Sequence, residues 1–128
     1  MTFGEKIKFC RSCLGLLQTD LAEEIGVSQR TIHSYEKLGA IPHKKNIRKL
    51  AKALCVTEEF LFDDSVSDPG DDFYEESYQR ELRKFVKEKT PALMAGTSIE
   101  ENTIEIFLES YRQVFMDSLR KALEKEML

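Results

Sequence analysis

Long apolar runs are missing from this sequence of 128 residues. No stretch approaches the ~20 consecutive apolar residues that a membrane-spanning helix needs. The beginning of the chain, MTFGEKIKFC, also lacks the apolar segment of a signal peptide. We therefore expect a cytoplasmic protein with no membrane segment. The length predicts one domain, or one small domain with an appendage.

Cysteine is scarce, with only Cys10, Cys13 and Cys55. An odd number of cysteines in a chain expected in the cytoplasm argues against a disulfide framework. A zinc site built on Cys10 and Cys13 would need two more ligands, and His33 and His43 do not have finger-like or ribbon-like spacing with them. Two alternatives stay open, a redox pair at Cys10 and Cys13 or a buried, inert thiol at Cys10.

Catalytic motifs are missing as well. The sequence has no glycine-rich loop that would cradle a phosphate, and no nucleophile stands in a recognisable pattern with a base. We therefore expect no enzyme, no bound cofactor and no metal site.

Charge is unevenly distributed along the chain. The net charge is -4, but residues 1–62 carry +3 and residues 63–128 carry -7. A basic first half is compatible with a nucleic-acid partner if the acidic half is held away from the phosphates.

Two short helical patterns meet at Gly26 within residues 18–36, QTDLAEEIGVSQRTIHSYE. Gly26 can take the positive φ of a tight turn, and Ser28 is a good N-cap for the second helix. The pattern predicts a helix-turn-helix, with an ordinary helical hairpin as the alternative. The apolar residues at helical spacing are Leu21, Ala22, Ile25, Ile32 and Tyr35.

The second of these helices is predicted to turn polar and basic side chains outward. Residues three to four apart share one helix face, and in the major groove glutamine can pair with adenine and arginine with guanine. We therefore predict double-stranded DNA as the partner. The outward residues are Gln29, Arg30, His33, Ser34 and Lys37.

Three further helices are expected around this pair, at residues 4–14, 46–54 and 57–62. The first has an apolar stripe that ends before Gly15: Phe3, Ile7, Cys10 and Leu14. The fourth follows a loop and has the inward set Ile47, Leu50, Ala51 and Leu54. Together the five helices predict an all-α domain.

Residues beside the predicted reading helix are candidates for phosphate contacts. Gln18 opens the second helix, where it is either a phosphate contact or a local cap. Lys44, Lys45 and Asn46 at the start of the fourth helix either neutralise phosphates or form a solvated basic face.

Residues 3–62 resemble the phage-repressor (XRE or Cro-like) helix-turn-helix family. The resemblance rests on Ile7 and Arg11, on LGLLQTDLAEEIGVSQRTIHSYE, on Pro42 and on KLAKALCVTEEFL. It implies a five-helix DNA-binding domain in which Arg11 forms an ion pair with Glu36. The DNA-binding set expected is Gln18, Ser28, Gln29, Arg30, Thr31, His33, Ser34, Lys37, Lys44, Lys45 and Asn46.

Three positions depart from the family pattern. Leu17 stands where serine or threonine usually caps the second helix, which puts that cap in doubt. Gly39 comes one residue later than usual after Glu36. Cys55 stands where glycine or asparagine commonly ends the fourth helix, so we expect a left-handed residue there at some cost.

The second half of the chain predicts an acidic linker and two helices. Residues 63–72 form the linker, a helix from Tyr74 ends near Lys89, and Pro91 interrupts it. Ser98 and Glu101 form a capping box for a final helix of about 28 residues. Its apolar stripe is Ile104, Leu108, Tyr111, Phe115, Leu119 and Ala122, widened by Phe107, Val114, Leu123 and Met127.

The final helix is longer than its predicted partner of ~17 residues. This imbalance favours a homodimer through the region 73–128, with folding back onto the first domain as the alternative. The leading hypothesis is a dimeric bacterial transcription regulator, a repressor, on a pseudo-palindromic operator with half-sites about 34 Å apart.

Two other functions stay open. The chain is alternatively an antitoxin-like or anti-regulator module whose C-terminal helices capture a protein. A third possibility is a sensor, with a ligand enclosed by the tail or with oxidation of Cys10 and Cys13.

Overall fold

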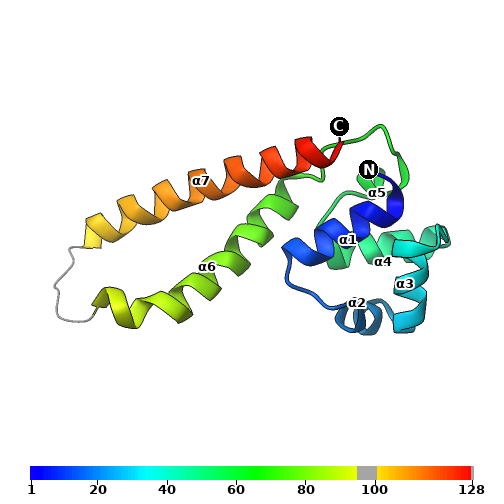
Figure 1. The fold of residues 1–128 in the computed structure, drawn as a ribbon, viewed down its shortest axis with the longest axis horizontal. Coiled ribbons are helices and arrows are strands. Elements are labelled where there is room, and N and C mark those ends of the chain that lie inside the picture. Colours follow the sequence, from blue (N-terminus) through cyan, green and yellow to red (C-terminus); the bar gives the residue numbers. More distant parts are fainter. Residues whose placement is uncertain (95–100, 128) are drawn as a thin grey trace.

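The computed structural model describes residues 1–94 and 101–127, which contain seven α-helices and no strand (Figure 1). An all-α architecture is therefore confirmed. The first five helices are α1 (Phe3–Cys13), α2 (Gln18–Ile25), α3 (Gln29–Lys37), α4 (Lys44–Leu54) and α5 (Glu58–Phe62). Two longer helices follow, α6 (Asp71–Met94) and α7 (Glu101–Met127).

Short polar residues begin three of the first five helices. The side chains of Thr2, Ser28 and Thr57 each accept a hydrogen bond from the backbone N–H three residues later, so each satisfies a donor that the helix leaves open. Leu17 has no such group, but Asp20 accepts a hydrogen bond from the Leu17 N–H at 2.8 Å. These hydrogen bonds therefore help to set where α1, α2, α3 and α5 begin.

The helix boundaries differ from the prediction at α4. This helix begins at Lys44, two residues earlier than predicted, because the His43 carbonyl accepts hydrogen bonds from the amides of Asn46 and Ile47. Cys55, which ends α4, has a φ of 58°, so the predicted left-handed conformation is confirmed. Gly39 has a φ of +70° and makes the turn that follows α3.

The apolar residues of α1 to α5 form one core. The predicted inward residues of the helix-turn-helix are all buried, and Cys10 is buried with them. The core of these helices consists of Ile7, Cys10, Leu14, Leu21, Ala22, Ile25, Ile32, Tyr35, Leu50, Ala51, Ala53, Leu54, Phe60 and Leu61.

Helix α1 approaches the end of α3 so closely that only glycine fits. A Cβ on Gly4 would lie 2.4 Å from the Tyr35 carbonyl oxygen and 2.9 Å from that of Glu36. These atoms belong to the backbone and cannot turn away. Gly4 therefore sets the distance between α1 and α3.

Lys6 of the same helix is buried, although a lysine is normally exposed. Its ammonium donates hydrogen bonds to the carbonyl oxygens of Phe60, Asp63 and Val66 at 2.6, 3.0 and 2.9 Å. The group also lies 4.5 Å from the centre of the Phe60 ring. This lysine ties α1 to α5 and to the segment that leads to α6.

Two expectations for the second half were wrong. Helix α6 begins at Asp71, inside the predicted linker, and it continues through Pro91 to Met94. A proline has no N–H to donate to the carbonyl four residues earlier and can bend a helix, so α6 continues through Pro91 at the cost of one backbone hydrogen bond. Because α6 has 24 residues and α7 has 27, the length imbalance on which the dimer prediction relied is not present.

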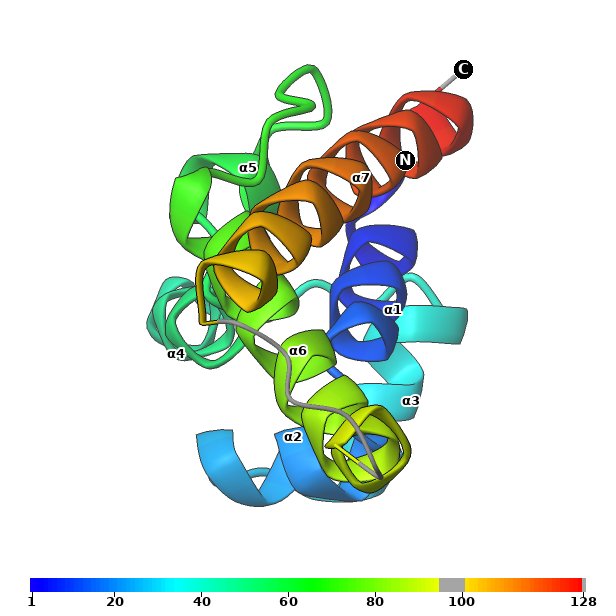
Figure 2. The same cartoon turned by 90° about the vertical axis from the view of Figure 1, so that its left-hand side faces the viewer.

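Helices α6 and α7 form a hairpin with one end against the first domain (Figure 1, Figure 2), and ring contacts join the two helices from Tyr78 and Phe115 to Phe85 and Phe107. Phe73, Leu119 and Leu123 belong to the same core as α1 to α5, and Arg80 donates a hydrogen bond to the Leu14 carbonyl at 3.1 Å. The tail therefore folds back, the alternative weighed above. Leu123, expected on a dimer face, is buried, while Ile106, Phe107 and Val114 are exposed.

Ser98 of the predicted capping box lies outside the described residues, as do the side chains of Ile104 and Met127. Within the described ranges, no helix is both long enough and apolar enough to cross a membrane.

Candidate nucleic-acid interface

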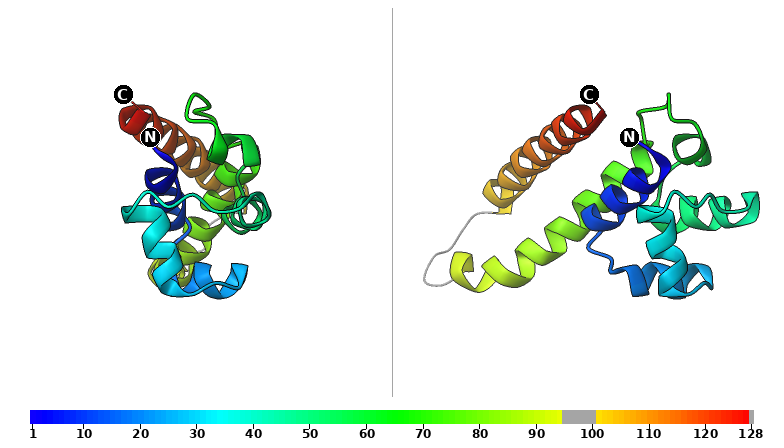
Figure 3. Two further views of the ribbon diagram at one scale, coloured as in Figure 1. Left: turned by 90° about the vertical axis from the view of Figure 1, so that its right-hand side faces the viewer. Right: turned by 45° about the vertical axis from the view of Figure 1, so that its right-hand side comes forward.

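The outward face of α3 is open to solvent. Gln29, Arg30, His33 and Lys37 are exposed, whereas Ile32 and Tyr35 on the opposite face are buried. In every view α7 lies on the side of the domain away from α2 and α3 (Figure 1, Figure 2, Figure 3). Helix α7, the last helix of the acidic half of the chain, therefore does not cover the outward face of α3.

A hydrogen bond joins the first residues of α2 and α3. The Gln29 side-chain amide donates to the Gln18 side-chain oxygen at 2.6 Å. An amide has one acceptor and two donor hydrogens, so Gln29 keeps its oxygen and one N–H for another partner. The bond restricts how the Gln29 side chain can turn. The sequence contained both residues but gave no signal for the contact between them.

The hydroxyl groups of α3 are engaged within the helix. Ser28 accepts a hydrogen bond from the Thr31 N–H at 3.1 Å, and the two hydroxyl groups lie 2.9 Å apart. Ser34 donates to the Arg30 carbonyl at 3.0 Å. Thr31 and Ser34 are also only half-exposed. Gln29, Arg30 and His33 therefore present more open polar groups than the three hydroxyls do.

Basic residues lie at both ends of the loop that follows α3. Lys37 is the last residue of α3, and Lys44 and Lys45 are the first two of α4, all of them exposed. Asn46 is half-buried beside them. Lys8 of α1, which was not among the predicted residues, lies beside Lys37. The pKa of Lys8 is lowered by a side-chain hydrogen bond with Lys37 and by the positive charge of that residue. Two ammonium groups side by side create a local positive potential.

Arg11 and Glu36 join α1 to α3. The guanidinium donates from Nε and Nη2 to the two carboxylate oxygens of Glu36, both at 3.0 Å, and from Nη1 to the Leu16 carbonyl at 2.8 Å. The Glu36 side chain is 0% exposed and that of Arg11 is 13% exposed. This is the fork-to-fork geometry in which an arginine pair is strongest. The third bond fixes the chain just before α2.

Cys10 and Cys13 lie in surroundings that disfavour the thiolate. Burial raises the pKa of the Cys10 thiol far above its ordinary value, and it raises the pKa of Cys13 to about 11. Both groups are therefore thiols at neutral pH, while thiol oxidation starts from the thiolate. Among the described residues, no three histidine, cysteine or carboxylate side chains are grouped to hold a metal ion.

Comparison with known proteins gives a match to the same part of the chain. A helix-turn-helix family model matches residues 13–61. The SPbeta prophage-derived uncharacterized HTH-type transcriptional regulator YonR of Bacillus subtilis (strain 168) is 36% identical over 59 residues. That alignment covers 46% of this chain and 55% of the relative, so the chain spans about half the length of the protein that it matches.

Among solved structures, the SinR protein/SinI protein complex is similar over 94% of this chain and 99% of the matched chain. The sequence identity is 23% and the TM-score is 0.48.

The ion pair gives a testable prediction for stability. Replacement of Arg11 by Ala leaves the Glu36 carboxylate buried without its partner, which costs about 3 kcal/mol of unfolding free energy in such pairs. Urea unfolding followed by circular dichroism measures the loss. Lys8→Ala, a substitution of an exposed residue on the same helix, is the control and is expected to change stability by less than about 0.5 kcal/mol. Equal stability of Arg11→Ala and Lys8→Ala would contradict the assigned role.

Proposed function

We propose that the protein is a sequence-specific, double-stranded DNA-binding transcriptional regulator, because a helix-turn-helix family model matches residues 13–61. In this proposal α3 enters the major groove. The observation that carries it is the exposed face of Gln29, Arg30 and His33, with Gln29 held by Gln18 at 2.6 Å. Side chains of this kind match the donor and acceptor pattern of base edges.

The proposed contacts divide into two groups. Gln29, Arg30 and His33 read bases, and Ser34 and Thr31 contribute through the oxygen atoms that still accept hydrogen bonds. The second group holds the phosphates and so sets the register without reading sequence. It consists of Gln18, Ser28, Lys37, Lys44, Lys45 and Asn46.

We further propose that two copies act together as a repressor on a pseudo-palindromic operator. A twofold protein favours two half-sites about 34 Å apart, one turn of the duplex. The three exposed apolar residues of α7, Ile106, Phe107 and Val114, support a contact between copies in the tail. The lengths of α6 and α7, 24 and 27 residues, are nearly equal and give no further support for this contact.

A random-duplex selection tests the proposed function. The protein is expected to enrich a pseudo-palindromic motif, and its affinity for that motif should fall steeply with salt because lysines and arginines that bind phosphates release counterions from the DNA. If no motif is enriched and the affinity is insensitive to salt, the proposal is wrong.

Two substitutions separate base reading from phosphate binding. Arg30→Ala should cost about 1 to 3 kcal/mol on the selected motif and relax the preference at one base pair. Lys45→Ala should weaken binding to all sequences by a similar factor and reduce the salt slope by about one. Competition assays over single-base variants of the motif measure both effects. The same loss of preference in both variants would contradict the division of roles.

A second function, capture of another protein, is favoured by the same exposed residues of α7. Since Phe73, Leu119 and Leu123 are part of the core, removing the tail would also damage the first domain. The full chain with Val114→Glu is therefore the better probe. Loss of a co-purifying protein, with operator binding unchanged, would favour this function. The redox sensor has less support, because the pKa of Cys13 is about 11 and that of Cys10 is higher still.

A further inference from the structure

One face of α6 packs against the first domain and ends at Arg80. Phe73 and Ser77 of this face are 0% and 1% exposed, and Phe73 belongs to the core of the first domain. Residues three and four positions apart share a helix face, which places Arg80 next on it. Lys84, one turn further along, is exposed. Arg80 therefore lies where α6 leaves the domain.

The Arg80 side chain reaches from α6 to the end of α1. Its Nη1 donates a hydrogen bond to the Leu14 carbonyl at 3.1 Å, and its Nε donates to the Glu76 carboxylate at 3.0 Å. Leu14 is the C-cap of α1, and the last carbonyl groups of a helix have no partner within it. A cation is also favoured there, because a helix C-terminus is the negative end of its dipole. Arg80 therefore completes the end of α1.

Two arginines from different parts of the chain hold the turn between α1 and α2. Arg80 binds the Leu14 carbonyl from the tail, and Arg11 binds the Leu16 carbonyl from α1 at 2.8 Å. Gln18, the first residue of α2, follows two positions after Leu16. The conformation of this short turn therefore sets where Gln18 begins α2.

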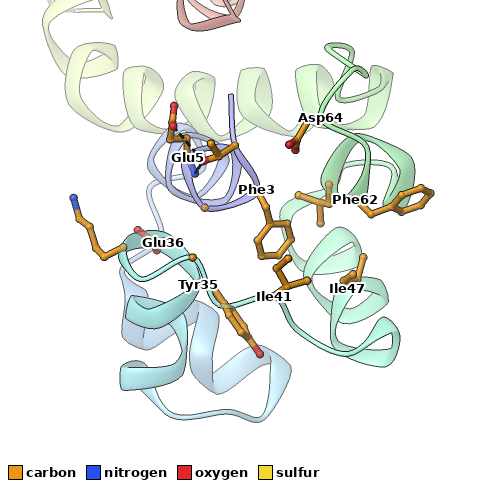
Figure 4. Close-up of a pocket in the computed structure, with 13 residues that line it drawn as sticks. Phe3, Glu5, Tyr35, Glu36, Ile41, Ile47, Phe62 and Asp64 are labelled. Carbon is orange, nitrogen blue, oxygen red and sulfur yellow. Dashed lines mark hydrogen bonds between the residues drawn. The ribbon is translucent and has the colours of Figure 1, made fainter.

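The opposite end of α1 is fixed to α3. The ring centres of Phe3 and Tyr35 are 6.2 Å apart, and Figure 4 shows both residues, together with Glu36, around one pocket. Gly4 allows the two backbones to approach there. Because α1 and α3 are joined in this way, the turn after Leu14 helps to place the beginning of α2 against α3.

We propose that Arg80 of the tail is a positioning residue for the DNA-binding face, acting on Gln18 through the Leu14 carbonyl and the turn. Gln18 accepts the hydrogen bond of Gln29 at 2.6 Å, and in the proposed function it also contacts a phosphate. Without Arg80 the turn gains freedom, so more conformational freedom is lost when Gln18 binds. The tail thus contributes to DNA affinity through a residue that does not touch DNA.

Direct attraction between the Arg80 charge and the DNA is the alternative that the experiment must separate. Arg83 provides the matched control, because it lies on the same helix, carries the same charge and pairs with the same Glu76 at 3.6 Å. Its side chain is 67% exposed, and its removal leaves the bond between Arg80 and Leu14 in place. Arg83→Met therefore removes the charge alone.

This inference rests on the proposed function, and a double-mutant cycle on the selected operator tests it. Arg80→Met should lower the affinity about fivefold in the wild-type background, the size expected for coupling through neighbouring contacts. In the Gln18→Ala background the same substitution should have less than about a twofold effect, because Gln18 is then absent. Arg83→Met should stay within about twofold of wild type. Arg80→Lys keeps the charge and a donor, so its affinity should lie between those of Arg80→Met and wild type.

The outcomes distinguish the two proposals. If Arg80→Met binds like Arg83→Met, or if its effect is the same with and without Gln18, the inference is wrong although the protein binds DNA. If the wild type selects no motif, the proposed function fails and this inference falls with it. Circular dichroism verifies folding, which is expected because the Arg80 side chain is 36% exposed. Should Arg80→Met not fold, Arg80→Lys takes its place in the same cycle.

Discussion

The bridge between Arg11 and Glu36 is the interaction on which the orientation of α3 depends. The Glu36 carboxylate is fully buried, so it must be paired, and Arg11 satisfies both of its oxygens while also holding the Leu16 carbonyl. Gly4 brings α1 within contact of the Tyr35 and Glu36 carbonyls, which makes this pairing geometrically possible. Helix α1 therefore holds both the end of α3 and the residues just before α2.

Several polar side chains at the outward face of α3 are also held in place by hydrogen bonds. Its hydroxyl groups are used within the helix, and the hydrogen bond from Gln29 to Gln18 links α3 to α2 across the turn at Gly26. A side chain that is already held loses less conformational freedom when it binds. In the proposed function, Gln29 is therefore prepared for one orientation toward a base, while Arg30 and His33 supply the more adaptable contacts.

Local patterns in the sequence predicted the first five helices because spacing, caps and glycine positions are local properties. The burial of Lys6 was not predicted, although Lys6 lies on the same helix face as Phe3 and Cys10. A lysine side chain is normally exposed to solvent, and the three carbonyl groups that Lys6 binds are more than fifty residues away in the sequence. Pro91 led to an early predicted end for α6, because a proline disfavours a helix locally but does not always end it. The stripe of α7 correctly predicted burial at Leu119, but an amphipathic pattern does not specify which surface it meets.

Methylation interference tests the central claim, that the outward face of α3 reads base edges in the major groove, most directly. Methylation of guanine N7 blocks an acceptor in the major groove, whereas methylation of adenine N3 blocks the minor groove. With wild-type protein on the selected operator, we expect interference at a guanine N7 in each half-site, and we expect Arg30→Ala to become insensitive at that guanine. Interference only at adenine N3, or the same guanine pattern for wild type and Arg30→Ala, would contradict the account.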